Sequence, residues 1–130
     1  MILVDSSAWV EFLRGTGSST HRRLRSALQE GEEVAWTDLV ALEVLAGARD
    51  DADHDRLRRL LYGQHFLAVD GPADYESAAE LYRACRRGGD TPRRLADCLI
   101  AVVAIRNDVE LLCCDVDFQV IARHAPLRLR

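Results

Sequence analysis

Four short apolar runs, each ending in an aspartate, constrain the fold of this chain more than any other feature. They occupy residues 2–5, 34–38, 66–70 and 111–115. Continuous apolar runs of this length are typical of strands buried on both faces, as in a parallel sheet. Because helical patterns fall between the runs, the sequence predicts an α/β fold, a three-layer α/β/α sandwich with a mostly parallel central sheet.

The segments between the runs space their apolar residues as helices do. Helices are expected from near residue 21 to 28, over 39–45, around 57–61 and over 75–82, with Gly47 and Gly88-Gly89 as stop signals. Residues 95–105 are apolar almost all round, which is typical of a helix buried between layers. Residues 127–129 are compatible with a short last strand. No linker or repeat is present, so a single domain spanning residues 1–130 is expected.

The composition narrows the chemistry that the chain can perform. All 17 basic residues are arginine, so no lysine is present to act as a nucleophile or Schiff-base former. Arginine suits bidentate contacts to phosphate. The four cysteines lack C-x-x-C spacing, and we expect small core residues of a reduced protein rather than zinc ligands. No signal segment and no apolar run of membrane-spanning length is visible, which predicts a cytoplasmic protein without membrane contact.

Aspartates are expected where the predicted strands end. In open α/β sheets, ligands bind outside the carboxyl ends of the strands, and Asp5, Asp38, Asp70 and Asp115 occupy such positions. An aspartate after a strand is also a favoured helix N-cap, and we interpret Asp38 and Asp70 as caps or turn residues. Asp5 is followed by two serines that can cap the next helix. Asp5 is therefore less needed as a helix cap and is a candidate for the functional site, with helix capping as the alternative interpretation.

Two further carboxylates lie inside predicted helices. Asp97 interrupts a helix that otherwise consists of Leu, Cys, Ile, Ala and Val. A carboxylate in an apolar layer destabilises the fold by several kcal/mol unless it is paired or bound to a metal. An ion pair with Arg93, four residues earlier, is the structural alternative. Glu43 lies between Leu42 and Val44, and its alternative is a solvent-facing position on an amphipathic helix.

Asp115 and Asp117 place two carboxylates just past a strand, a spacing that holds one hard cation or forms a polar turn. Several carboxylates at one end of a sheet raise one another's pKa unless a cation neutralises them. Oxygen-only ligands favour Mg²⁺ or Mn²⁺. Such a site stabilises phosphoryl-transfer charge and activates water at neutral pH. No histidine lies in these segments, so a Ser/His/Asp catalytic set is not expected.

Four sequence blocks resemble one family. The opening Asp5-Ser6-Ser7 is similar to the first-strand motif of the PIN-domain ribonucleases, and within them of the VapC-type toxins of bacterial toxin–antitoxin pairs. Glu43 within residues 41–47 is similar to the family's helix glutamate. Residues 97–101 resemble its D-C-L-I-A signature, and residues 115–118 resemble its D-x-D-F ending. The blocks occur in family order over nearly the whole chain. One departure is Cys113-Cys114, where the family often has threonine or serine.

The resemblance implies a single PIN domain over residues 1–130 that acts as an Mg²⁺-dependent endoribonuclease, with Mn²⁺ as a possible substitute. It implies catalytic Asp5, Glu43, Asp97 and Asp115; metal ligands Asp5, Asp97, Asp115 and Asp117; and Ser7 and Arg93 as supporting or RNA-contacting residues. It also implies an RNA substrate, a homodimer and a VapB-type antitoxin, with operator DNA bound only through the toxin–antitoxin complex.

Two alternatives come from other functional classes. A non-catalytic PIN-fold binding module would keep the scaffold for a partner, and retention of every acidic block argues against it. A phosphotransfer enzyme or receiver domain also places aspartates at strand ends, but those families depend on a lysine that this chain lacks. The arginine-rich segment with Arg86, Arg87, Arg93 and Arg94 is interpreted either as an RNA-backbone contact or as a solvated helix end.

Overall fold

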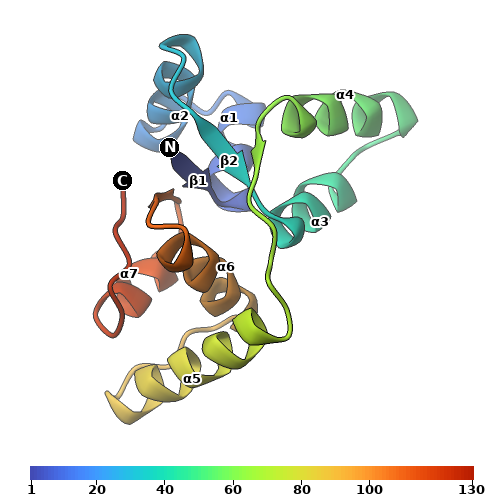
Figure 1. Cartoon of the computed structure of the whole chain (residues 1–130). Coiled ribbons are helices and arrows are strands. Elements are labelled where there is room, and N and C mark those ends of the chain that lie inside the picture. The colour runs from blue at the N-terminus through green and yellow to red at the C-terminus, as the bar shows by residue number, and fades with distance from the viewer.

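The computed structural model describes residues 1–130 and has a parallel four-stranded sheet at its centre (Figure 1). The strands are β1 (Ile2–Val4), β2 (Val34–Trp36), β3 (His65–Phe66) and β4 (Glu110–Leu112), in the order β3-β2-β1-β4. Leu3 is paired with Ala35 on one side and with Leu111 on the other. The predicted α/β fold is confirmed, and all four strands are parallel.

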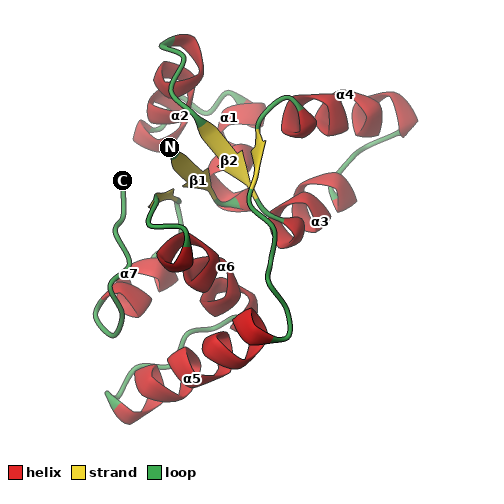
Figure 2. Ribbon diagram, in the orientation of Figure 1, coloured by secondary structure: helices red, strands yellow, loops and turns green.

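Seven helices accompany this sheet. They are α1 (Ser6–Arg14), α2 (Ser19–Gln29), α3 (Asp38–Ala46), α4 (Asp51–Tyr62), α5 (Ala73–Arg87), α6 (Leu95–Arg106) and α7 (Asp117–Ala122). Figure 2 shows α1 to α4 in the upper part of the molecule and α5 to α7 in the lower part. Gly47 and Gly88 occupy the C-cap positions of α3 and α5, as the sequence predicts.

The elements that carry the predicted site residues are anchored in the hydrophobic core. Every residue of β1 and β2 is buried, and so is every residue from 97 to 104 in α6. The prediction of a helix buried between layers is therefore confirmed for α6. Leu129 forms an isolated parallel bridge with Leu111, so the predicted last strand is reduced to one pair of residues.

The third apolar run differs from its prediction. A strand over residues 66–70 buried on both faces is wrong, because β3 covers only His65–Phe66 and both of its residues are exposed. It is an edge strand with β2 as its only neighbour. The chain then leaves the sheet, and the N–H of Val69 donates to Asp38 Oδ2 at 2.7 Å. The aspartate of that loop therefore does not lie at a sheet end with the others.

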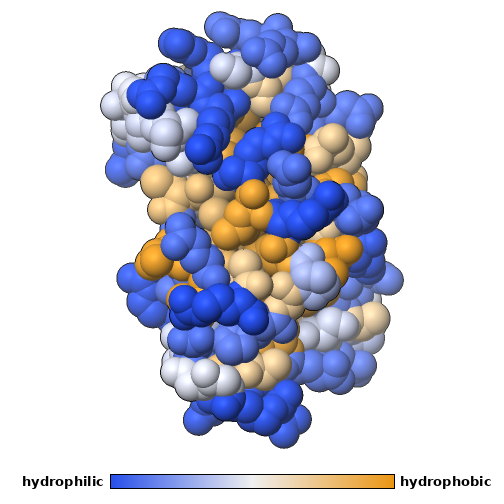
Figure 3. Space-filling model, turned by 90° about the vertical axis from the view of Figure 1, so that its left-hand side faces the viewer, coloured by the Kyte–Doolittle hydropathy of each residue, from blue (hydrophilic) through white to orange (hydrophobic).

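The surface carries both polar and apolar regions. The face drawn in Figure 3 has an apolar band between two polar regions. Across the whole molecule, Leu42 and Leu95 are each 65% exposed. None of the helices combines the length and the apolar character that crossing a membrane requires.

Candidate metal centre

Asp5 follows β1 directly and is itself the N-cap of α1. Its Oδ2 accepts from the N–H of Ser7 at 3.0 Å and from the hydroxyl of Ser7 at 2.6 Å. The expectation that a serine would cap this helix in its place is wrong. Asp5 is only 3% exposed, and its Oδ1 is buried without a hydrogen-bond partner. One carboxylate oxygen thus serves the fold, while the other is free for a ligand.

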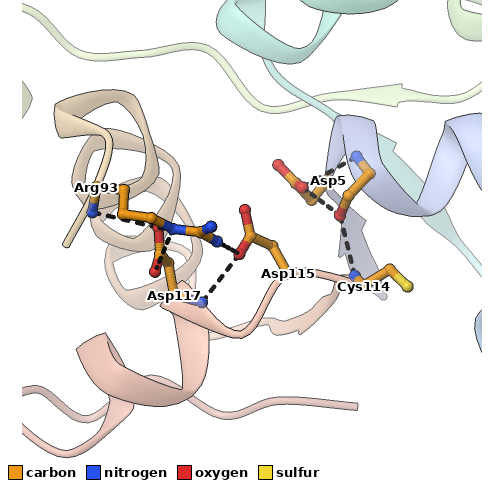
Figure 4. A network of polar contacts seen from close by, with 6 residues as sticks. Asp5, Arg93, Cys114, Asp115 and Asp117 are labelled. Atoms are coloured by element: carbon orange, nitrogen blue, oxygen red, sulfur yellow. Dashed lines mark hydrogen bonds and ion pairs between the residues drawn. The ribbon is translucent and has the colours of Figure 1, made fainter.

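The Ser7 hydroxyl connects this aspartate to the segment after β4. The N–H of Cys114 donates to Ser7 Oγ at 2.9 Å, and Ser7 in turn donates to Asp5. Figure 4 labels Asp5 and Cys114 at the two ends of these hydrogen bonds. Ser7 therefore lies where a supporting role requires it. Cys114 is exposed, which corrects the expectation that all four cysteines are core residues; Cys85 and Cys98 are buried.

Asp97 lies in the first turn of α6 and is 1% exposed. Its Oδ2 has no hydrogen-bond partner. Burial raises the pKa of Asp97 to about 7; the positive charge of Arg94 lowers it, and the negative charge of Asp5 raises it further. The ion pair with Arg93 considered from the sequence is absent, because α6 begins only at Leu95 and Arg93 has no helical spacing to Asp97.

Arg93 instead bridges Asp115 and Asp117 (Figure 4). Its Nη2 donates to Asp115 Oδ1 at 3.0 Å, and its Nε donates to Asp117 Oδ2 at 3.1 Å. Its backbone N–H also donates to Asp117, at 3.2 Å. Hydrogen bonding to Asp117 and the charges of both aspartates raise the pKa of Arg93. Asp117 donates its own N–H to Asp115 Oδ1 at 3.0 Å, so the pair also forms the polar turn that was its alternative.

Glu43 comes from α3 and forms an ion pair with Arg94, the N-cap residue of α6. Its side chain is 21% exposed and its Oε1 is buried without a partner, so Glu43 does not face solvent freely. Sequence reasoning missed this pair because 51 residues separate its members. The hydrogen bond to Glu43 raises the pKa of Arg94.

Asp38 and Asp70 lie outside this cluster, as their interpretation as caps or turn residues predicts. Thr37 holds the N-cap position of α3, and Asp38 binds the loop after β3 instead. The N–H of Asp70 donates to Asp74 Oδ2 at 2.7 Å. Asp74 is 2% exposed and is paired with Arg106, a structural ion pair that no sequence pattern indicated.

The donor set of the cluster fits a hard divalent cation. The carboxylates of Asp5, Glu43 and Asp97 each keep one buried oxygen without a protein donor. Asp97, Asp115 and Asp117 each offer a carboxylate oxygen within 4.8 Å of the other two. Hard oxygen ligands without nitrogen or sulfur suit Mg²⁺ or Mn²⁺. Four of the five carboxylates follow a strand or begin a helix, which is why the fold gathers them.

Comparison with known proteins identifies the family to which the chain belongs. The PIN domain family model matches residues 2–124. Ribonuclease VapC11 of Mycobacterium tuberculosis is 47% identical over 124 residues, which cover 95% of this chain and 92% of the relative. The chain belongs to the PIN-domain family, among the VapC ribonucleases. Membership of this family explains why the chain has the acidic sequence blocks and the parallel sheet that carries them.

Solved structures confirm the PIN fold. VapBC2 from Rickettsia felis, bound to a DNA fragment from its promoter, has a TM-score of 0.76 at 17% identity, covering 100% of this chain and 98% of that one. VapC20 of Mycobacterium tuberculosis, a sarcin-ricin loop cleaving toxin, has a TM-score of 0.66 at 17% identity and covers 98% of this chain and 99% of that one. At such identities the likeness concerns the fold alone.

Proposed function

We propose that this VapC protein is a metal-dependent endoribonuclease that hydrolyses RNA phosphodiester bonds and acts as the toxin of a VapBC-type pair. The observation that carries the proposal is the pair of buried aspartates, Asp5 and Asp97, each with an oxygen that no protein group satisfies. Burying a carboxylate in this way is unfavourable unless a cation neutralises it. Relatives at 47% identity are named ribonucleases.

Asp5 and Asp97 are the residues we propose as direct ligands of Mg²⁺, for which Mn²⁺ can substitute. Asp115 would complete the site through water, and Asp117, which the family resemblance also implies as a ligand, is paired with Arg93. When bound, the ion would stabilise negative charge on the phosphate and lower the pKa of a water molecule to near neutrality. The acidic donor set supports this assignment because it contains no nitrogen or sulfur ligand.

Glu43 is the residue we propose to orient the attacking water and accept its proton. Arg94 holds one of its carboxylate oxygens, which leaves the buried Oε1 without a partner for this task. Ser7 fixes Asp5 through two hydrogen bonds. Attack by water does not use the ribose 2′-hydroxyl, so no 2′,3′-cyclic phosphate forms. With the ribose 3′ oxygen as the leaving group, the products carry a 5′-phosphate and a 3′-hydroxyl.

RNA binding in this proposal depends on arginines at the end of α5 and in the segment before α6. Arg86 and Arg87 are exposed in the last turn of α5, and Arg93 and Arg94 follow in the next loop. Guanidinium groups recognise phosphate through paired hydrogen bonds. The partners proposed are a VapB-type antitoxin and a second copy of the chain in a homodimer, with operator DNA bound only through the complex. The VapBC2 structure on promoter DNA supports the antitoxin and the DNA.

The test is cleavage of RNA by the purified chain with Mg²⁺ or Mn²⁺, with EDTA as control and Asp97→Asn as the decisive variant. The expected loss of activity exceeds about 100-fold, since changing even an outer partner of a metal ligand costs 10–100-fold. Asp70→Asn is the matched control, because Asp70 lies outside the cluster. A folded Asp97→Asn variant that cleaves at the wild-type rate would overturn the proposal and favour a non-catalytic PIN-fold module.

A further inference from the structure

The guanidinium of Arg93 lies where the acidic cluster has its densest negative charge. Three carboxylates, from Asp97, Asp115 and Asp117, bring one oxygen each within 4.8 Å of the others. Arg93 contacts two of them, Asp115 at 3.0 Å and Asp117 at 3.1 Å. Like charges this close are unfavourable unless a cation is present. Arg93 supplies a built-in cation for one half of the cluster.

Asp97, the third carboxylate, has a different environment from Asp115 and Asp117. Asp97 is 1% exposed, and its Oδ2 accepts no hydrogen bond from Arg93 or from any other protein group. Neither Asp5 nor Asp97 forms an ion pair with an arginine, because Arg94, whose charge acts on Asp97, is itself paired with Glu43. Because one half carries a paired guanidinium and the other carries unsatisfied buried oxygens, the two halves have different needs for an added ion.

We propose that the guanidinium of Arg93 occupies the position that a second divalent cation would otherwise take. The wild-type site then binds a single ion, on the side of Asp5 and Asp97. The inference rests on the proposed function, because it assumes that the cluster binds a metal. Two-metal nucleases use a second ion to stabilise charge on the reacting phosphate. A guanidinium fixed by Asp115 and Asp117 brings a positive charge to the same place without a second ion.

The remaining donors of Arg93 suit this role. A guanidinium has five N–H groups in a fixed fork. The Nε and one Nη2 hydrogen are directed to Asp117 and Asp115, and the Nη1 group makes no hydrogen bond within the protein. The Arg93 side chain is 68% exposed, so these free donors are accessible to a phosphate oxygen. Arg93 therefore pairs with the carboxylates through one edge and presents another to the substrate.

The experiment counts bound Mn²⁺ per chain, by electron paramagnetic resonance of free Mn²⁺ and by calorimetry, in the wild type and in Arg93→Met. The wild type is expected to bind one ion, and Arg93→Met two, because the carboxylates of Asp97, Asp115 and Asp117 then lack their counter-charge. Adding Asp117→Asn to Arg93→Met should return the count to one. Arg93→Gln provides a second neutral variant that still offers Asp117 a hydrogen-bond donor.

Arg83→Met is the matched control, since Arg83 is exposed on α5 and forms no ion pair. It removes the same charge and should leave the count at one. Two ions in the wild type would overturn the inference, and so would one ion in both folded Arg93 variants. Either result would leave the proposed function intact. A wild-type chain that binds no Mn²⁺ would contradict the proposed function as well, so the two failures are distinguishable.

Discussion

Asp117 on one side of the acidic cluster, and Asp5 and Asp97 on the other, are all buried, but their negative charges are balanced differently. Asp117 is 5% exposed and has Arg93 as its partner. Asp5 and Asp97 are 3% and 1% exposed and form no ion pair, and Arg94, whose charge acts on Asp97, is paired with Glu43. A buried carboxylate that lacks a counter-charge raises the energy of the folded state. In this fold Arg93 balances the charge of Asp115 and Asp117, whereas Asp5 and Asp97 each keep a buried oxygen that no protein group satisfies.

The first and largest effect concerns catalysis. Asp5→Asn is expected to lower kcat/KM by more than about 100-fold, whereas Asp115→Asn should lower it by about 10-fold to 100-fold, as an outer partner does. The reason is that Asp5 offers an unsatisfied oxygen, while Asp115 already accepts from Arg93 and from the N–H of Asp117. RNA cleavage under excess Mg²⁺ measures both.

Asp51→Asn serves as control for that comparison, because Asp51 is exposed at the start of α4. It should retain wild-type activity. Equal losses for Asp5→Asn and Asp115→Asn would show that the two halves bind the metal equally, and the distinction drawn between them would be wrong.

The second effect concerns the stability of the metal-free protein. Replacing an aspartate by asparagine should raise the free energy of unfolding at Asp97 and lower it at Asp117. The folded-state pKa of Asp97, about 7, lies above the value of 3.8 for an aspartate in water. Stability that depends on the protonated form is therefore present below pH 4 and is lost as the pH rises through 7. In EDTA at pH 8, Asp97→Asn is expected to raise the free energy of unfolding by about 2 kcal/mol.

Asp117→Asn should instead destabilise the metal-free protein by about 1 kcal/mol, because it removes the charged partner of Arg93. Urea unfolding at pH 8 and at pH 4.5 measures both variants. The gain from Asp97→Asn should shrink at the lower pH, since the wild-type carboxyl is then protonated in the folded state. A gain that is independent of pH, or a stabilising Asp117→Asn, would contradict the assignment of charges.

Sequence reasoning reached the candidate residues but not their pairing. Asp5 and Asp115 were recognisable because each follows an apolar strand, and Asp97 because it interrupts an apolar helix. The partner of Arg93 was not recognisable. Spacing along a helix suggested Asp97, yet Arg93 precedes the helix and contacts residues 22 and 24 positions later. Such contacts depend on how α6 and α7 pack, which no local pattern encodes.

The strand at the edge of the sheet shows the same limit. Residues 66–70 have the composition of a buried strand, but burial on both faces requires neighbouring elements that the sequence does not specify. In the structure β3 has one sheet neighbour, and Phe66 is 48% exposed. The fold class was thus predictable from the alternation of elements, whereas the length and burial of an individual strand were not.

The smallest effect concerns Ser7, which supports Asp5 through hydrogen bonds. Ser7→Ala removes the 2.6 Å hydrogen bond to Asp5 Oδ2 and keeps the backbone N–H that caps through the same oxygen. Mn²⁺ affinity should fall by about 10-fold, the lower end of the range for an outer partner of a metal ligand. Cleavage at saturating Mg²⁺ should change far less, because Asp5 remains in place. Ser6→Ala is the matched control, since no hydrogen bond joins its hydroxyl to Asp5. Equal Mn²⁺ affinities for Ser7→Ala and Ser6→Ala would mean that the capping N–H alone orients Asp5.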